Sequence, residues 1–188
     1  MNVLAISGSL RATSINSAFC RAASRLAPEG LLITVFSGLG ELPLFNPDLE
    51  VDPPHQVLAL RAAVGRADAL LIASPEYAHG LSGAMKNALD WLVSFEGFVA
   101  KPVVVVNTSP RARHAHDSLL EVLKTMSATL LCEPSVTLPL LGSCITEDEI
   151  IKSPAVSSQI RYSLDALARC FRETDESGPG FPVGPNDA

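Results

Sequence analysis

The sequence predicts a three-layer α/β domain in which helices cover both faces of a five-stranded parallel sheet. Short apolar runs that suit buried strands alternate with longer segments whose apolar residues recur every three or four positions. Strands that are apolar on both faces need helices on both sides of the sheet. At 188 residues, 47% of them hydrophobic, the chain is long enough for one such domain with a substantial core.

Five strands and five helices are expected in alternation along the chain. The strands are expected at residues 2–7, 32–36, 69–74, 102–107 and, more weakly, within 130–138. Apolar residues share one helical face within residues 19–26, 57–67, 81–92, 119–126 and 156–171. These elements predict one domain over residues 1–172. From Glu173 on, clusters of Gly and Pro replace the periodicity, which predicts a disordered tail over residues 173–188.

Composition and charge argue against several classes of function. A formal net charge of −6 gives no electrostatic footprint for nucleic acid or an anionic membrane. No segment has the roughly 18 to 20 apolar residues that span a bilayer, and no signal-peptide pattern precedes the first strand. Because the chain has no Cys-x-x-Cys pair, neither a zinc site nor a dithiol centre is predicted. We expect its four cysteines to be reduced and mostly buried: Cys20, Cys132, Cys144 and Cys170. We expect a cytoplasmic protein without nucleic-acid or membrane partners.

The most informative local pattern is the loop after the first strand, Ser7-Gly8-Ser9-Leu10-Arg11-Ala12-Thr13-Ser14-Ile15-Asn16. A loop between a parallel strand and a helix N-terminus presents unpaired N–H groups and the positive end of the helix dipole, where an anion binds. Gly8 permits close backbone approach, and donors come from Ser9, Arg11, Ser14 and Asn16. The loop therefore predicts a phosphate site. In the alternative interpretation, Ser14 or Asn16 only caps the helix.

Two further polar loops are expected at the same edge, because ligands of parallel sheets bind beyond the carboxyl ends of the strands. The third strand is followed by Ser74-Pro75-Glu76-Tyr77-Ala78-His79-Gly80, and the next helix is expected to be capped by Ser82. The fourth strand is followed by Ser109-Pro110-Arg111-Ala112-Arg113-His114. Three converging loops suit a ligand with a phosphate at one end and a flat polar ring at the other.

Several residues near these loops have structural interpretations that we favour over chemical ones. Asp90 follows Lys86 by four residues, which is typical of a structural ion pair on a helix. Trp91 is more typical of a core or interface than of a stacking platform. His114 and His116 have no acidic or cysteine partner at ligand spacing, so no metal site is predicted. A low-molecular-weight tyrosine phosphatase is ruled out, because its first loop needs a nucleophilic Cys and residues 7–14 contain none.

Two of the motifs, in their observed order, resemble the NAD(P)H-dependent FMN reductases of flavodoxin-like fold, which include quinone and chromate reductases. The first is Ser7-Gly8-Ser9-Leu10-Arg11 with Ser14 and Asn16. The second is Pro75-Glu76-Tyr77, followed by Gly83 and Lys86-Asn87-Ala88-Leu89-Asp90-Trp91-Leu92. The similarity extends over residues 1–172 and implies a flavodoxin-like FMN-binding reductase domain there, with the tail after it.

The resemblance implies which residues bind the cofactor. In the family the first loop binds the FMN phosphate, which gives that role to Ser9, Arg11, Ser14, Ile15 and Asn16. The loop after the third strand lies against the isoalloxazine ring, which gives that contact to Pro75, Glu76, Tyr77, Ala78, His79 and Gly80, with Ser109 added from the fourth loop. Residues 42–46 match the family's segment that closes over the site or the subunit interface.

The chain departs from the family pattern at two places. Ala78 stands where many members have Asn, so a side-chain hydrogen bond to the ring is lost and backbone groups must bind it. The fourth loop has Pro110 and arginines where many relatives have glycines. Either this loop is a solvated basic surface, or phosphates of the nicotinamide cofactor meet Arg111, Arg113, His114 and His116.

The resemblance implies an enzyme, an NAD(P)H-dependent flavin oxidoreductase that moves a hydride from NAD(P)H through FMN to a small acceptor such as a quinone. FMN carries the chemistry, so no indispensable acid–base residue is expected. Family members complete the site from a neighbouring subunit, which implies a homodimer or homotetramer. Two alternatives stay open: a nonenzymatic flavodoxin-like electron carrier, and a nucleotide-binding regulatory subunit without catalysis.

Overall fold

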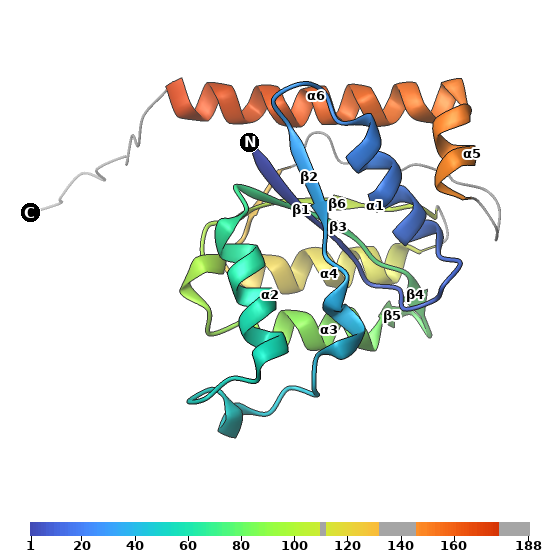
Figure 1. Ribbon diagram of the computed structural model, residues 1–188. Coiled ribbons are helices and arrows are strands. Elements are labelled where there is room, and N and C mark those ends of the chain that lie inside the picture. The colour runs from blue at the N-terminus through green and yellow to red at the C-terminus, as the bar shows by residue number, and fades with distance from the viewer. Residues whose placement is uncertain (110–111, 132–145, 177–188) are drawn as a thin grey trace, which may run out of the picture.

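A five-stranded parallel sheet forms the centre of the molecule (Figure 1). The structure is a computed structural model that describes residues 1–109, 112–131 and 146–176. The sheet order is β2-β1-β3-β6-β7, and its strands are β1 (Asn2–Ser7), β2 (Leu32–Val35), β3 (Ala69–Ala73), β6 (Pro102–Val106) and β7 (Thr129–Leu130). All neighbouring pairs are parallel. This order is that of flavodoxin-like folds, which confirms the predicted fold class.

Helices cover both faces of the sheet (Figure 1). One face packs against α1 (Ile15–Leu26), α5 (Glu147–Lys152) and α6 (Pro154–Glu176). The other face packs against α2 (His55–Arg66), α3 (Gly83–Asp90) and α4 (Arg113–Thr125). The described residues also form three short 3-10 turns: η1 (Gly38–Glu41), η2 (Pro47–Leu49) and η3 (Glu96–Phe98). The predicted helical segments are confirmed, and α5 is an addition to them.

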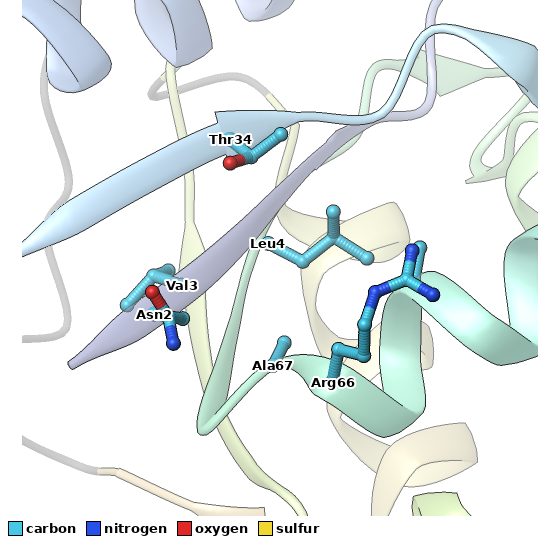
Figure 2. A pocket seen from close by; sticks show the side chains of 7 residues that line it. Asn2, Val3, Leu4, Thr34, Arg66 and Ala67 are labelled. Atoms are coloured by element: carbon cyan, nitrogen blue, oxygen red, sulfur yellow. The ribbon is translucent and has the colours of Figure 1, made fainter.

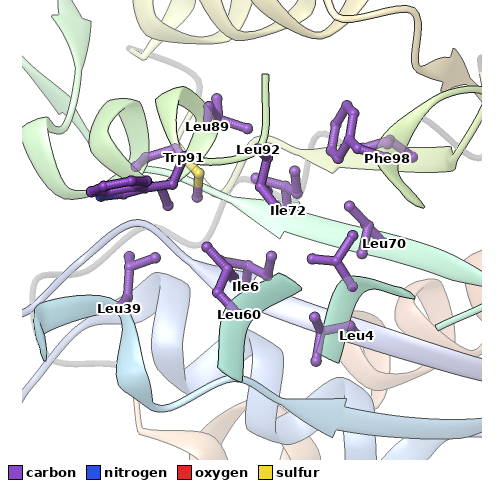
Figure 3. Close-up of a cluster of buried hydrophobic side chains, with 14 of the residues drawn as sticks. Leu4, Ile6, Leu39, Leu60, Leu70, Ile72, Leu89, Trp91, Leu92 and Phe98 are labelled. Atoms are coloured by element: carbon purple, nitrogen blue, oxygen red, sulfur yellow. The ribbon is translucent and has the colours of Figure 1, made fainter. Parts of the chain in front are cut away.

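The alternation of side chains along each strand explains the two layers. In β1, Val3 and Ala5 belong to the core beneath α1 and α6, whereas Leu4 and Ile6 belong to the core beneath α2 and α3. All four are at most 4% exposed, as expected of a strand that is apolar on both faces. Figure 3 shows the second core, where Trp91 and Phe98 contribute the largest buried side chains.

The predicted bounds of the first four strands agree with the observed ones within one residue. The fifth strand was expected within 130–138 and begins at Thr129, but most of that range lies outside the described residues. Helix α6 runs to Glu176, past the boundary expected at residue 172. Residues 177–188 of the predicted tail lie outside the described residues, so the division of the chain into domain and tail stays a prediction.

Several of the structural interpretations are confirmed. Lys86 Nζ lies 2.6 Å from Asp90 Oδ1, and the Trp91 side chain is fully buried. Cys20 is a free, buried thiol whose pKa is raised to about 12 by burial, so it stays protonated at neutral pH. The side chains of the other three cysteines lie outside the described residues. No helix in the described part of the chain is both long and apolar enough to cross a membrane.

Candidate functional site

A pocket of about 300 Å³ opens at the edge of the sheet where β1, β3 and β6 have their carboxyl ends. This is the edge at which a doubly wound sheet binds its ligands. Three segments line the pocket: the start of α1 with Ile15 and Asn16, the loop after β3 with Ser74, Pro75 and Glu76, and the loop after β6 with Thr108, Ser109 and Ala112. The three loops predicted to converge therefore do so.

The first loop is fixed at Gly8, where the backbone passes close to its neighbours. The Gly8 N–H donates to the Ala73 carbonyl at 2.8 Å, and the Gly8 carbonyl accepts from Ser82 Oγ at 2.6 Å. Ser82 Oγ also accepts from the Met85 N–H at 3.1 Å, so the predicted cap of α3 is confirmed. One hydroxyl thus joins the first loop to the start of α3.

The start of α1 has the features of an anion site. Ser14 is its N-cap, because Ser14 Oγ accepts from the Ser17 N–H at 3.3 Å, and this confirms the capping role weighed from the sequence. Among the described residues, nothing accepts from the N–H groups of Ile15 and Asn16, the first two residues of the helix. The first turn contains no acidic residue. The positive end of the helix dipole is therefore not neutralised by an acidic side chain of its first turn.

Asn16 connects the first loop to the loop after β6. Its Oδ1 accepts from Thr108 Oγ1 at 2.8 Å, and both side chains are buried. The amide nitrogen of Asn16 makes no hydrogen bond within the described part of the chain, so it keeps two donors at the pocket. Ser9 is nearly buried in the same loop, whereas the Arg11 side chain is exposed.

The loop after β3 forms a small hairpin that the sequence did not predict. Its strands are β4 (Glu76–Tyr77) and β5 (Gly80–Leu81), joined by a two-residue turn. Ala78 and His79 in that turn have φ angles of +49° and +58°, the left-handed region that favours Gly or Asn. Tyr77, Ala78 and His79 are exposed and do not line the pocket.

Two contacts join this hairpin to the first turn of α4. Glu76 Oε2 accepts from the Ala115 N–H at 2.9 Å, so a carboxylate caps a helix whose own N-cap, Ala112, has no side-chain acceptor. The imidazole rings of His79 and His114 are stacked, with centroids 4.3 Å apart and planes 20° apart. The loops after β3 and β6 are thereby held together.

Asn107 shapes the loop after β6. Its Oδ1 accepts from the Ser109 N–H at 3.0 Å, and its Nδ2 donates to the Ala112 carbonyl at 3.3 Å. Arg113 is exposed at the start of α4. Pro110 and Arg111, which the sequence analysis singled out, lie outside the described residues.

The predicted cofactor residues divide into three groups. The pocket is lined by five of them: Ile15, Asn16, Pro75, Glu76 and Ser109. Ser9 and Ser14 are buried in the first loop, and the remainder lie outside the pocket in the adjoining loop and hairpin. Sequence reasoning missed three lining residues, Ser74, Thr108 and Ala112. Each lies one to three positions from a predicted residue. Their place in the loops that follow strands β3 and β6 was the signal that could have found them.

A second pocket of about 330 Å³ lies at the other end of the strands (Figure 2). Figure 2 shows Asn2, Thr34 and Arg66 around a floor that includes Leu4 and Ala67. This end of a parallel sheet carries the amino ends of the strands and no helix N-terminus lines it, so it lacks the anion-binding features of the first pocket. The pocket at the carboxyl edge is therefore the candidate functional site.

The fold defines a flavodoxin-like protein, and its candidate site includes the unpaired N–H groups at the start of α1. Comparison with known proteins narrows the class. The profile of the NADPH-dependent FMN reductase family matches residues 1–139. The chain belongs to this family, as its first-loop and third-loop motifs indicated.

Individual relatives agree with the family. A quinone reductase from Pseudomonas putida is 39% identical over 115 residues, which are 59% of this chain and 61% of the relative. A 2-hydroxy-1,4-benzoquinone reductase from Burkholderia sp. is 29% identical over 179 residues, which are 92% of this chain and 97% of the relative. In the curated relatives matched at higher identity, the aligned part spans only 47% to 61% of the relative.

Solved structures agree on the fold. The flavoenzyme NAD(P)H:(acceptor) oxidoreductase FerB from Paracoccus denitrificans superposes with a TM-score of 0.70 over 89% of this chain and 97% of that one. The two sequences are 24% identical.

Proposed function

We propose that the protein is an NAD(P)H-dependent FMN reductase that passes electrons to a small acceptor such as a quinone. The observation that supports this most is the pocket at the carboxyl edge. One of its ends is a helix N-terminus with unpaired donors and no acidic residue, in a chain of the FMN reductase family. The named activities of the relatives, quinone reductase and FMN reductase, support the same reaction class.

The residues present fit FMN. Its phosphate is a dianion that needs several donors, and the start of α1 offers the N–H groups of Ile15 and Asn16 with the Asn16 amide beside them. The Ser9 hydroxyl and the exposed Arg11 guanidinium belong to the same loop and supply further donors. Pro75 and Glu76, with Ser109 opposite, wall the part of the pocket that would take the ring.

When bound, FMN supplies the redox chemistry by accepting an electron pair from NAD(P)H and giving it to the acceptor. The protein's part is to bind and orient. Glu76 is already committed to the N-terminus of α4, so we assign it no proton transfer. Tyr77 is 51% exposed beside the pocket wall, where it is available to an incoming flat molecule.

The test is spectroscopic. The purified protein, mixed with FMN and then separated from unbound flavin by gel filtration, should retain the flavin's visible absorption. NADH or NADPH under anaerobic conditions should bleach it rapidly. Adding a quinone should then restore the absorption. Bound FMN that neither nicotinamide donor bleaches would identify the nonenzymatic electron carrier, and a protein that binds nucleotide but no flavin would identify the regulatory alternative.

We also propose that the protein is a cytoplasmic homodimer or homotetramer. The free thiol of Cys20 suits a reducing compartment. Asn87 holds the segment before η2 on α3, because its Nδ2 donates to the Pro43 carbonyl at 2.9 Å and its Oδ1 accepts from the Phe45 N–H at 2.7 Å. This clamp leaves the Leu44 side chain 84% exposed between its two anchors. A rigidly presented apolar side chain suits contact with a second copy.

The oligomer can be tested at that residue. Leu44→Asp should shift the protein toward the monomer in light scattering after size exclusion, because a buried carboxylate at the contact is costly. Val99→Asp is the control, because Val99 is also exposed, at 61%, but follows η3 away from this segment. An unaltered protein that is monomeric, or equal effects of both changes, contradicts the proposal.

A further inference from the structure

The hairpin of β4 and β5 packs against α4 (Figure 1), and two side-chain contacts join it to the first turn of that helix. The Glu76 carboxylate caps α4 through the Ala115 N–H. At the other end of the hairpin, the His79 ring stacks on the His114 ring, the second residue of α4. Both imidazoles belong to exposed residues, so this stack adds little to the hydrophobic core.

The stack occurs at a strained point of the backbone. Ala78 and His79 both have positive φ angles, although neither is Gly or Asn. Positive φ angles at both central residues are what a two-residue hairpin turn of type I′ requires. Because its residues disfavour the turn, contacts outside the hairpin must help to hold it, and the stack on His114 is such a contact at His79.

The same contacts join two segments that line the candidate pocket. Glu76 belongs to the hairpin and lines one wall, while Ala112 immediately precedes α4 and lines another. Whatever fixes the hairpin on α4 therefore fixes these two walls relative to each other.

We propose that His79 and His114 are positioning residues that act as a pair, holding the β4–β5 hairpin on α4 so that the pocket walls fit the flavin ring. This inference rests on the proposed binding of FMN. It assigns the pair no contact with reacting atoms. The two histidines affect the binding of the flavin ring and leave the binding of the phosphate at α1 unchanged.

The test is a set of variants that remove one ring without disturbing the local backbone. His79→Asn keeps a residue that tolerates a positive φ, and His114→Ala keeps a good helix former. The double variant removes both rings. His114→Phe keeps a flat ring for His79 and is the rescue variant. His55→Ala is the control, because His55 is an exposed histidine at the start of α2.

Dissociation constants of FMN and of riboflavin should be measured by fluorescence titration, beside the thermal midpoint of each variant. The loss of either imidazole ring should weaken flavin binding about three- to tenfold, which corresponds to the energy of one aromatic pair. The factor should be the same for FMN and riboflavin, because riboflavin lacks only the phosphate. The double variant should bind flavin with the same affinity as the single variant that binds it less tightly. His114→Phe should bind flavin with the affinity of the unaltered protein.

Each other outcome overturns the inference. Losses that add in the double variant show that the rings do not act as a pair, and a midpoint that falls while flavin affinity stays constant shows a role in stability only. Failure of His114→Phe to restore binding excludes stacking as the cause. An unaltered protein that does not bind FMN overturns the proposed function as well, and the titration of that protein alone reveals this.

Discussion

At the scale of single residues, Gly8 has no room for a side chain. A Cβ there would lie 2.6 Å from Ser74 Oγ and 3.1 Å from the Cβ atoms of both Ser74 and Met85. The hydroxyl can rotate away, but the two Cβ atoms are fixed to the loop after β3 and to α3. Gly8 is therefore needed for the close approach of three segments, which explains a glycine in the first loop without any ligand.

Gly8→Ala should lower the free energy of unfolding by about 1–3 kcal/mol, the usual cost of overpacking, as measured by urea denaturation. Gly83→Ala is the matched control, because a Cβ at Gly83 meets no heavy atom within 4 Å. That control should unfold at the same urea concentration as the unaltered protein or at a higher one, because Gly83 is a helical residue and Ala is the better helix former. Equal losses for the two variants would contradict the steric explanation.

Ala78 is the residue that departs most clearly from the family pattern, and its backbone gives the reason that Asn suits this position. Its φ angle of +49° costs a residue with a Cβ roughly 1–2 kcal/mol. Gly escapes this cost but loses about 0.5–1 kcal/mol through its greater freedom in the unfolded chain. Ala78→Gly should therefore raise the free energy of unfolding, by up to about 1.5 kcal/mol.

The comparison for this prediction is Ala62→Gly, a change at an exposed position inside α2. The same substitution should there lower the free energy of unfolding by about 1 kcal/mol, because helix interiors disfavour Gly. Changes of opposite sign in the free energy of unfolding, measured by urea denaturation, identify the turn conformation as the cause of the effect at Ala78. Destabilisation at both positions would show that Ala78 is not strained.

At the scale of elements, α5 is a short helix with a capping box. Thr146 Oγ1 accepts from the Glu149 N–H at 3.3 Å, and Glu149 Oε2 accepts from the Thr146 N–H at 2.7 Å. The backbone hydrogen bond, with that of the Thr146 hydroxyl, lowers the pKa of Glu149 below its ordinary value. The charged carboxylate is therefore the form that stabilises α5.

This lowered pKa predicts a pH dependence with a definite sign. A depressed folded-state pKa stabilises the protein above the unfolded-state value, about 4.3 for Glu, and the gain is lost as pH falls through the folded-state value. The difference in unfolding free energy between the unaltered protein and Glu149→Gln should be largest near neutral pH and shrink below about pH 4.3. Thermal unfolding measured across this range is the check, and a difference that does not change with pH contradicts it.

The elements also show what the sequence can predict. Among the described strands, β1, β3 and β6 were predictable because they are apolar on both faces, a pattern that helices rarely share. β2 was predictable from its β-branched residues, although its Leu32 and Thr34 side chains are exposed. The β4–β5 hairpin was not, because its strands have two residues each and its turn uses Ala78 and His79 in place of Gly or Asn. Helix α5 was missed because six residues are too few for a periodic pattern, although Thr146 and Glu149 carry the capping signature.

The candidate site was predictable to the extent that its residues carry chemistry. Asn16 and Glu76 stand out in the sequence because they are polar residues that soon follow an apolar strand, and both line the pocket. Ala112 lines it too but has no polar group to notice. Thr108 was hidden for another reason, since its importance comes from a hydrogen bond to Asn16, 92 positions away. The contact of any of these residues with FMN stays a prediction.

At the scale of the whole molecule, the pocket is formed by the same strands that carry the two cores. β1, β3 and β6 contribute alternate residues to both core clusters, and their carboxyl ends support all three lining segments. A ligand that touches these segments joins parts of the chain that only the folded protein brings together. Binding and folding are therefore linked, because the unfolded chain offers no such site.

This linkage predicts that FMN stabilises the whole fold. At 100 times its dissociation constant, FMN should raise the free energy of unfolding by about 2.7 kcal/mol, seen by calorimetry as a higher unfolding temperature. Riboflavin at the same concentration should raise it less, because it lacks the phosphate that the start of α1 would bind. Arg11→Ala removes a charge-assisted contact and should weaken FMN binding about 10- to 100-fold. In this variant the difference between the stabilisation by FMN and that by riboflavin should therefore be smaller. Equal shifts by FMN and riboflavin in the unaltered protein would mean that the phosphate is not bound at this loop.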